Sequence, residues 1–308
     1  MPELVTILEW SAFGSSLLCS WVYGNRTIGG PLIGVVTAIL FMLFGWFAGV
    51  PAAIAANLIF LGVHIRNGYK MIIEDKSRTF AKIAEGVNYL VETIYDDSVK
   101  TPDRVKDIIN LLVRETHGAS VAAGWWTDLE TGEPLPANIP LKTVLIHSEI
   151  SEAMEGHRKD ANDDKLPHRK MFEVELADAV IRAGDLLGKI GSDHAEIYLD
   201  EFDDLTEYLS DHGPYHYELE WVDPGEPVEV MLCKLHEKAT SVFVEAKGNL
   251  EALYYVDMAL CDFLLACFQV AHCTDIDLGG AIAEKMEFNA NRPDHKIENR
   301  KKGGGKKY

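Results

Sequence analysis

Residues 144–187 read VLIHSEISEAMEGHRKDANDDKLPHRKMFEVELADAVIRAGDLL and contain two stretches with helical periodicity, separated by a polar break. In each stretch apolar residues recur at helical spacing, which predicts two amphipathic helices. The break at 160–170 carries Pro167 and several charged residues, so it can turn the chain and let the helices pack antiparallel. The region therefore predicts an all-α fold.

Each predicted helix carries a pair of acidic residues, Glu149 with Glu152 and Glu175 with Asp178. Residues at i and i+3 share a helix face, so antiparallel packing would bring the carboxylates together. Carboxylates gathered at one place need cations, and all-oxygen ligands favour hard ions, Mg²⁺ first and Mn²⁺ as the alternative. The competing interpretation, that the acids lie on solvated faces, suits a single pair better than two pairs on consecutive helices.

The motif E-I-S-E at 149–152, followed by E-L-A-D at 175–178 and then V-I-R, resembles the MazG-like nucleotide pyrophosphohydrolases of the all-α NTP pyrophosphatase superfamily. The resemblance extends to G-W-W-T-D at 124–128. It also includes the closing segment EKMEFNANRPDHKIENRKKGGGKKY, which is similar to the end of many phage-encoded MazG-like proteins. It covers about residues 102–190 and 275–308.

This resemblance implies an enzyme that converts a (d)NTP to a (d)NMP and pyrophosphate. Glu149, Glu152, Glu175 and Asp178 would hold two or more Mg²⁺ ions around the triphosphate. Glu149, or alternatively Glu152, would accept the proton of the attacking water. Family members are usually dimers or tetramers, so a homo-oligomer is expected as well. The base of the substrate cannot be read from the sequence.

Several residues are candidates for contacting the nucleotide. Trp125 and Trp126 are adjacent and cannot share a helix face, so one indole can pack inward while the other, taken to be Trp125, stacks on a base; two packed indoles are the alternative. Arg158 and Lys159 follow the first acidic pair closely. They can reach phosphate oxygens or be ordinary surface charges.

The closing segment carries Lys285, Asn289 and Arg292. Lys285 and Asn289 are spaced i, i+4 and can face one ligand together. By resemblance, these residues would contact the phosphates or the sugar. The chain departs from compact family members by an insertion at about 191–274. The insertion either supplies the closing helices of the same bundle or folds separately, in which case another subunit would complete the site.

The N-terminal region is of a different kind, because the chain has no charged residue between Arg26 and Arg66. Apolar stretches at 4–24, 31–46 and 51–65 predict three membrane spans. A span needs about 20 residues, so the last two are short. We therefore expect a three-helix transmembrane unit in a lipid bilayer.

Basic residues set the expected orientation, since Arg66, Lys70, Lys76 and Arg78 follow the third stretch. The positive-inside rule then places the N-terminus outside and the C-terminal domain in the cytoplasm. The motifs W-V-Y-G-N-R and N-L-I-F-L-G-V-H-I-R-N within 4–70 resemble three-span half-transporter modules of the PnuC and SWEET type. That resemblance implies pairing of such units and passage of a nucleoside-like solute, whereas a plain anchor is the simpler interpretation.

The predicted organisation is a transmembrane unit at 1–70, a helical connector at 71–101 and a MazG-like all-α domain at 102–308. The connector is either a coiled stalk or a partner helix. A net charge of −19 argues against binding to nucleic acid. A di-iron bundle would need Glu-x-x-His pairs, which the sequence lacks. The alternative functions are a membrane-tethered nucleotide sensor and the regulatory domain of a nucleoside-type transporter.

Overall fold

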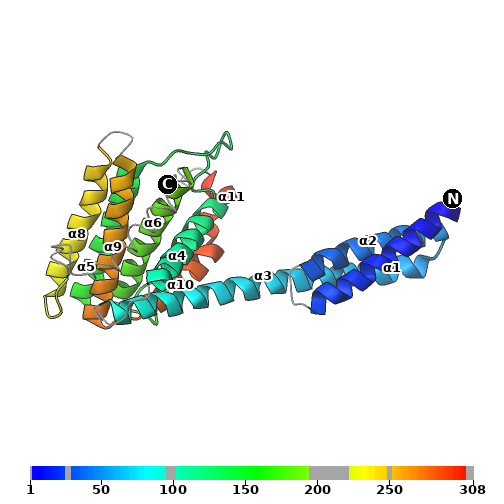
Figure 1. The fold of residues 1–308 in the computed structure, drawn as a ribbon, viewed down its shortest axis with the longest axis horizontal. Helices are drawn as coiled ribbons and strands as arrows, with labels where there is room; N and C mark the ends of the chain where they lie inside the picture. Colours follow the sequence, from blue (N-terminus) through cyan, green and yellow to red (C-terminus); the bar gives the residue numbers. More distant parts are fainter. Residues whose placement is uncertain (1, 25–28, 95–101, 194–221, 248–251, 303–308) are drawn as a thin grey trace. The chain divides into compact units, whose positions relative to one another are not determined.

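The computed structural model describes residues 2–24, 29–94, 102–193, 222–247 and 252–302 (Figure 1). In these ranges every regular element is a helix, and the only extended pairing consists of two isolated β-bridges. The predicted all-α class is confirmed. The chain divides into two compact units, Met1–Thr79 and Phe80–Tyr308, which are described separately.

The first unit contains α1 (Pro2–Gly24), α2 (Gly29–Ala48) and the beginning of α3 (Pro51–Thr93). Its interior is made of small side chains. Ala12 on α1 is fully buried, and the buried residues of α2 are Gly30, Pro31, Gly34, Thr37, Ala38 and Gly45. Small residues let helix backbones approach closely, as they do in membrane helix pairs.

The outer surface of the first unit is apolar, which is the reverse of a soluble bundle. The exposed large apolar side chains on its three helices are Leu4, Ile7, Trp10, Phe13, Leu17, Leu18, Leu32, Val36, Ile39, Leu43, Trp46, Phe47, Leu58, Ile59, Phe60, Val63, Ile65, Tyr69, Ile72 and Ile73. Soluble monomers rarely expose contiguous apolar patches of this extent. The outer surface of this unit is therefore compatible with an apolar environment and not with direct exposure to water.

Two helices of the described residues are long and apolar enough to cross a membrane, namely α2 and the segment Tyr255–Thr274 of the second unit. The second of these is mostly buried by protein, which is typical of the core helix of a bundle. Neither α1 nor the first part of α3 meets the same test of length and hydropathy. The finding is thus of two candidate helices, where the sequence predicted three spans.

A polar contact joins α1, α2 and α3 inside the first unit. The hydroxyl of Tyr23 lies 2.9 Å from Nδ1 of His64. The imidazole of His64 packs directly on Gly34, where an added Cβ would lie 2.2 Å from Nδ1. The sequence analysis treated the segments around Tyr23 and His64 as separate motifs, and the fold brings them together.

Gly34→Ala should loosen this unit, because the methyl group cannot fit unless the His64 ring moves and its contact with Tyr23 breaks. We expect a cost of about 1–2 kcal/mol, which corresponds to a ~5- to 30-fold increase in local opening. The measurement is the rate at which a maleimide labels the buried Cys19 in detergent. Gly62→Ala is the matched control, since an added Cβ there meets nothing within 4 Å. Equal labelling rates in the two variants would contradict the packing.

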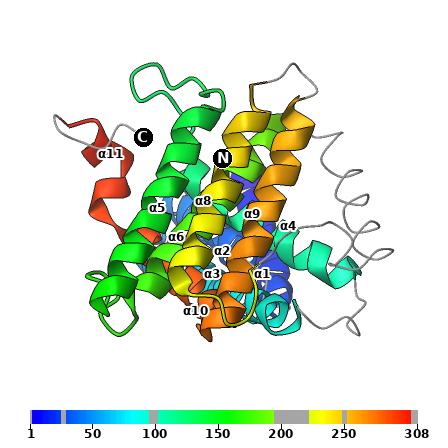
Figure 2. The same ribbon diagram turned by 90° about the vertical axis from the view of Figure 1, so that its left-hand side faces the viewer.

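The second unit is a helical bundle built around α6 (Figure 2). Its described helices are the end of α3, α4 (Pro102–Ala122), α5 (Ile139–Lys159), α6 (Met171–Asp193), α8 (Val228–Glu245), α9 (Ala252–Thr274), α10 (Leu278–Asn291) and α11 (Ile297–Arg300), with a short 3-10 helix, η1 (Pro293–His295), before the last. Helix α6 packs against α4, α5, α9 and α10, and α5 also packs against α8.

The position of α6 follows from its sequence. The predicted apolar stripe is fully buried or nearly so at Phe172, Leu176, Val180 and Ala183. The helix is covered on its other sides as well, since Val174 and Ala177 are also buried. A helix surrounded by protein buries even its acidic residues, which explains why Glu175 lies in the interior. The predicted apolar stripe is therefore correct, but α6 is buried over more of its circumference than an amphipathic helix would be.

Two of the helices, α8 and α9, come from the predicted insertion at 191–274. They pack on each other, α8 packs on α5, and α9 packs on α6. The described part of the insertion therefore belongs to the same bundle. Residues 194–221 and 248–251 lie outside the described residues.

Two predicted boundaries differ from the structure. The second unit begins at Phe80 and not at residue 102, because the end of α3 buries Ile83 and Val87 in the bundle core. Of the two roles considered for the connector, this part is a partner helix. The sequence DRVKDIINLLVRETHG at 103–118 predicts a helix that ends at Gly118, but α4 continues to Ala122, because a helical glycine costs only about 1 kcal/mol. The left-handed position that ends the segment is Gly124, with φ of 71°.

A candidate metal centre between α5 and α6

Local sequence signals set the ends of the helical hairpin. Helix α5 starts at Asn138, whose side chain accepts a hydrogen bond from the backbone of Leu141, and it ends at Asp160 in the left-handed conformation. Asp163 then organises the turn, because its Oδ1 accepts hydrogen bonds from the backbone amides of Lys165 and Leu166 at 2.9 and 2.7 Å. Asp163 opens the polar break, where its residue type predicts a turn or capping role; it has the turn role, and the chain reverses here as predicted.

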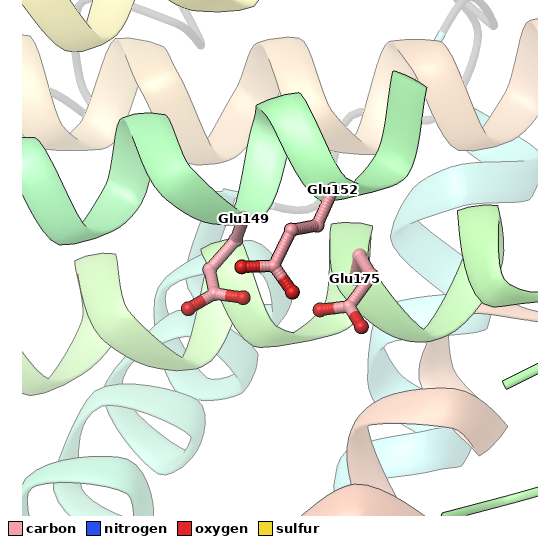
Figure 3. Close-up of side chains that lie close together, drawn as sticks. All are labelled: Glu149, Glu152 and Glu175. Carbon is pink, nitrogen blue, oxygen red and sulfur yellow. The ribbon is translucent and has the colours of Figure 1, made fainter. Parts of the chain in front are cut away.

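The hairpin brings Glu149 and Glu152 of α5 against Glu175 of α6 (Figure 3). Each residue offers one carboxylate oxygen, and the three oxygens lie within 4.8 Å of one another. Glu149 and Glu175 are buried, whereas Glu152 is exposed and accepts a hydrogen bond from the hydroxyl of Ser148 at 3.1 Å. The cluster is therefore an acidic site with one side open to solvent.

Proton sharing holds this cluster together when no cation is bound. Burial, the neighbouring charge of Asp178 and a hydrogen bond with Glu149 together raise the pKa of Glu175 to about 9, against the lowering effect of Lys285. Two carboxyl groups can share a hydrogen bond only if one of them is protonated. Glu175 is therefore the proton donor to Glu149 at neutral pH.

The fourth acid of the sequence pattern, Asp178, lies beside the cluster but is paired elsewhere. Its Oδ2 is 2.8 Å from Nζ of Lys285 on α10, whose side chain is only 3% exposed. Burial and the charge of Glu149 raise the pKa of Asp178, while Lys285 lowers it. Burial lowers the pKa of Lys285, but the carboxylates of Asp178 and Glu175 outweigh it, so that the net shift is upward. The pair is thus an internal ion pair at the edge of the acidic site.

Arg182 is a site residue that the sequence analysis did not single out. Its guanidinium lies 2.5 Å from Oε1 of Glu149, and its side chain is 38% exposed. Arg182 follows Asp178 by one helical turn, so the i, i+4 spacing could have pointed to it. The sequence analysis includes Arg182 in the V-I-R motif but assigns it no role at the site.

The donor set fits a hard divalent cation. In an octahedral Mg²⁺ site with ligands at about 2.0–2.1 Å, opposite oxygens are roughly 4.2 Å apart, close to the spread of the three glutamate oxygens. Without an ion, the proton on Glu175 and the guanidinium of Arg182 neutralise part of the negative charge of the cluster. A bound divalent cation would take over this role. Glu149, Glu152 and Glu175 would hold the ion.

Four of the predicted nucleotide contacts do not gather at this cluster. Arg158 and Lys159 both pair with Glu155 on the surface of α5. At the end of α10, Nη1 of Arg292 lies 3.5 Å from the side chain of Asn289, and its guanidinium also pairs with Asp294. Of the predicted substrate contacts on the closing segment, Lys285 reaches the acidic site by binding Asp178.

Both tryptophans pack against the bundle, which fits the alternative of two packed indoles. Trp126 is buried, and its indole N–H donates to Oδ1 of Asp185 at 2.7 Å. Trp125 is partly buried and is covered by the guanidinium of Arg300, which lies 3.5 Å above the ring, and by the edge of His295. Its indole face is therefore occupied by the closing segment in this structure.

Asp185 is a further buried carboxylate on α6, at the side of the helix that faces α4. Besides Trp126, its partners are Nζ of Lys142 at 3.1 Å and Nδ1 of His117 at 3.1 Å. These contacts tie α4, α5 and the loop after α4 to α6. Asp185 follows Asp178 by seven residues and shares its helix face, which predicts an outer-shell partner of the metal ligands; its contacts in the structure instead join helices.

Comparison with known protein families, curated proteins and solved structures finds no match for this chain. The case for a function therefore rests on the motifs and on the geometry of the acidic site.

Proposed function

We propose that this chain is a membrane-anchored, Mg²⁺-dependent nucleoside triphosphate pyrophosphohydrolase that converts a (d)NTP to a (d)NMP and pyrophosphate. The observation that carries the proposal is the convergence of Glu149, Glu152 and Glu175 from two adjacent helices. The E-x-x-E and E-x-x-D motifs, with their resemblance to the MazG-like family, supply the reaction type.

A bound Mg²⁺ would neutralise charge on the triphosphate and lower the pKa of a water molecule. Glu149 and Glu175 would hold the ion from the buried side, and Glu152 would hold it from the open side. Glu152 is exposed to solvent and is not tied to an arginine, so we assign it, of the two candidates, as the acceptor of the water proton.

The anchor is the first unit, which we propose to cross the lipid bilayer with all three of its helices. The support is its small-residue interior and its apolar outer surface, which extends over α1 and the start of α3 as well as over α2. In this arrangement the N-terminus is outside and the second unit is cytoplasmic, where nucleotides and Mg²⁺ are available.

The test uses the full chain in detergent. It is incubated with a panel of ribo- and deoxyribonucleoside triphosphates and Mg²⁺, and the products are separated by ion-exchange chromatography. Monophosphate and pyrophosphate in equal amounts, lost on addition of EDTA, are the expected result. Metal-dependent nucleotide binding without turnover would refute the enzyme and favour the alternative of a membrane-tethered sensor.

Arg182→Gln should separate substrate binding from metal binding. We propose that the half-exposed guanidinium leaves Glu149 when the ion binds and then contacts the phosphates. Losing such a charge-assisted contact, worth about 1.5–3 kcal/mol, should lower kcat/KM about 10- to 100-fold. Affinity for Mn²⁺ should stay equal or rise, because a competing cation is gone.

The matched control for this variant is Arg114→Gln on α4, since Arg114 is an exposed arginine that pairs with its neighbour Glu115. It should leave both quantities unchanged. Weaker Mn²⁺ binding by Arg182→Gln would show that the arginine supports the ion site and does not act on the substrate.

A further inference from the structure

The acidic site contains a cation of its own. The ammonium of Lys285 lies 2.8 Å from Oδ2 of Asp178, and its side chain is 3% exposed. The three glutamates offer oxygens within 4.8 Å of one another, and Asp178 is not among them. Three acids of the sequence pattern are thus available to a metal ion, and the fourth is bound by a lysine.

Helix α10, which carries Lys285, is held firmly at its start. The guanidinium of Arg169, just before α6, binds Asp277 at 2.9 Å and Glu284 at 2.8 Å. Asn88 of α3 donates to Asp277 at 2.6 Å and accepts from the backbone of Gly279 at 2.8 Å. Lys285 follows Glu284 directly, so its backbone is fixed against α6.

Lys285 cannot leave Asp178 without a large penalty. Separating the pair would leave the buried ammonium without its partner, which is strongly unfavourable. The pairing of Arg182 with Glu149 is different, because that side chain is 38% exposed and can turn into solvent. One cation of the site is therefore exchangeable and the other is permanent.

We propose that Lys285 is a resident cation of the acidic site, which neutralises Asp178 permanently and restricts the site to one divalent ion held by Glu149, Glu152 and Glu175. This rests on the proposed function, because it specifies how many ions that site binds. A lysine ammonium supplies charge but no coordination position for water or phosphate. Any second divalent ion must then arrive with the nucleotide, and Lys285 acts as a positioning residue and not as a phosphate ligand.

The experiment counts Mn²⁺ ions bound to the full chain in detergent without nucleotide, using the electron paramagnetic resonance signal of free Mn²⁺. We expect one ion per chain for the wild type. Lys285→Met releases the carboxylate of Asp178 beside the site, and we expect two ions per chain. Lys234→Met is the control, because it removes a partly buried lysine that is 2.8 Å from Glu226 on the same bundle. It should bind one ion.

A double variant, Lys285→Met with Asp178→Asn, covers the case in which the single variant does not fold, since it removes both charges of the pair. It should bind one ion with an affinity within about threefold of the wild type, because none of the three ligands is lost. Two ions or none in the wild type, one ion in a folded Lys285→Met, or loss of binding in the double variant would overturn the proposal.

These outcomes are separate from those of the hydrolysis assay. One bound Mn²⁺ without nucleotide turnover would refute the pyrophosphohydrolase and leave the role of Lys285 intact. Turnover by a chain that binds two ions in the absence of nucleotide would support the pyrophosphohydrolase and refute the role proposed for Lys285.

Discussion

Glu175→Gln should lower the Mg²⁺-dependent turnover of nucleoside triphosphate by about a thousandfold or more, because it removes a buried ligand of the site. Glu175 is 6% exposed and is the only acid that α6 contributes to the three-glutamate cluster. A glutamine keeps the shape of the side chain but cannot supply the negative charge. The measurement is the initial rate of pyrophosphate release at saturating Mg²⁺.

The same variant should not lose stability when metal is absent. In the wild type the Glu175 carboxyl is protonated and donates to Glu149, and the amide of glutamine can donate in its place. The unfolding temperature in EDTA should therefore match the wild type or exceed it. Low turnover together with a lower unfolding temperature would mean that the residue acts through the fold.

The matched control is Glu173→Gln, two positions earlier on the same helix. Glu173 is also buried, but its carboxylate pairs with Arg169 at 2.5 Å. Its loss should lower stability, because the guanidinium loses one of its acidic partners. Turnover measured below the unfolding transition should stay within about threefold of the wild type. A drop comparable to that of Glu175→Gln would show that turnover responds to any charge removed from α6.

Much of the acidic site could be predicted from spacing alone. The period of apolar residues defined α5 and α6, and the i, i+3 rule put Glu149 and Glu152 on one face. The turn at Asp163 made antiparallel packing the simple outcome. These are short-range relations, in which the residues that interact are close in the sequence or belong to adjacent helices.

The parts that could not be predicted depend on contacts between distant segments. The pairing of Asp178 with Lys285 requires α10 to pack on α6, and no periodicity says which helices of a bundle become neighbours. The partners of Arg158 and Lys159 were missed for another reason. Both lie within one turn of Glu155, and local surface pairs form whenever geometry allows, whatever the site needs.

The end of α3 illustrates the same limit. Its apolar residues have helical spacing, which fits a stalk and a bundle helix equally well. The structure shows a bundle helix, because the side chain of Asn88 forms hydrogen bonds with Asp277 and with the backbone of Gly279. Both residues are distant from Asn88 in the sequence. The close approach at Gly279, where an added Cβ would meet the carbonyl of Ala84 at 2.3 Å, shows how tightly this contact is packed.

Affinity for Mn²⁺ should rise with pH, by up to about tenfold per pH unit below pH 9. The folded, metal-free chain keeps a proton on the Glu175 carboxyl up to its raised pKa of about 9, whereas the ordinary value is 4.5. An ion can bind only if that proton leaves. Asp178 carries a raised pKa as well, so the two carboxyl groups titrate together and about one proton should be released from the pair.

The stability of the metal-free chain should change with pH in the opposite direction to its affinity for Mn²⁺. Between 4.5 and about 9 the folded state binds a proton at Glu175 that the unfolded state has released. The free energy of unfolding of the metal-free chain should therefore fall as pH rises through this window, by at most about 1.4 kcal/mol per unit from this group. Bound metal replaces the proton, so that saturating Mn²⁺ should flatten this dependence.

Isothermal titration calorimetry with Mn²⁺ at about pH 6 and about pH 8, each in two buffers of different ionisation enthalpy, measures both affinity and proton release. Glu173→Gln should retain the full pH dependence, because Arg169 and not the ion neutralises that carboxylate. Equal affinities at the two pH values, with no proton released, would mean that Glu175 is already ionised in the folded chain. The hydrogen bond from Glu175 to Glu149 would then be wrong, and the metal-free cluster would depend on Arg182 and Lys285 alone for its neutralisation.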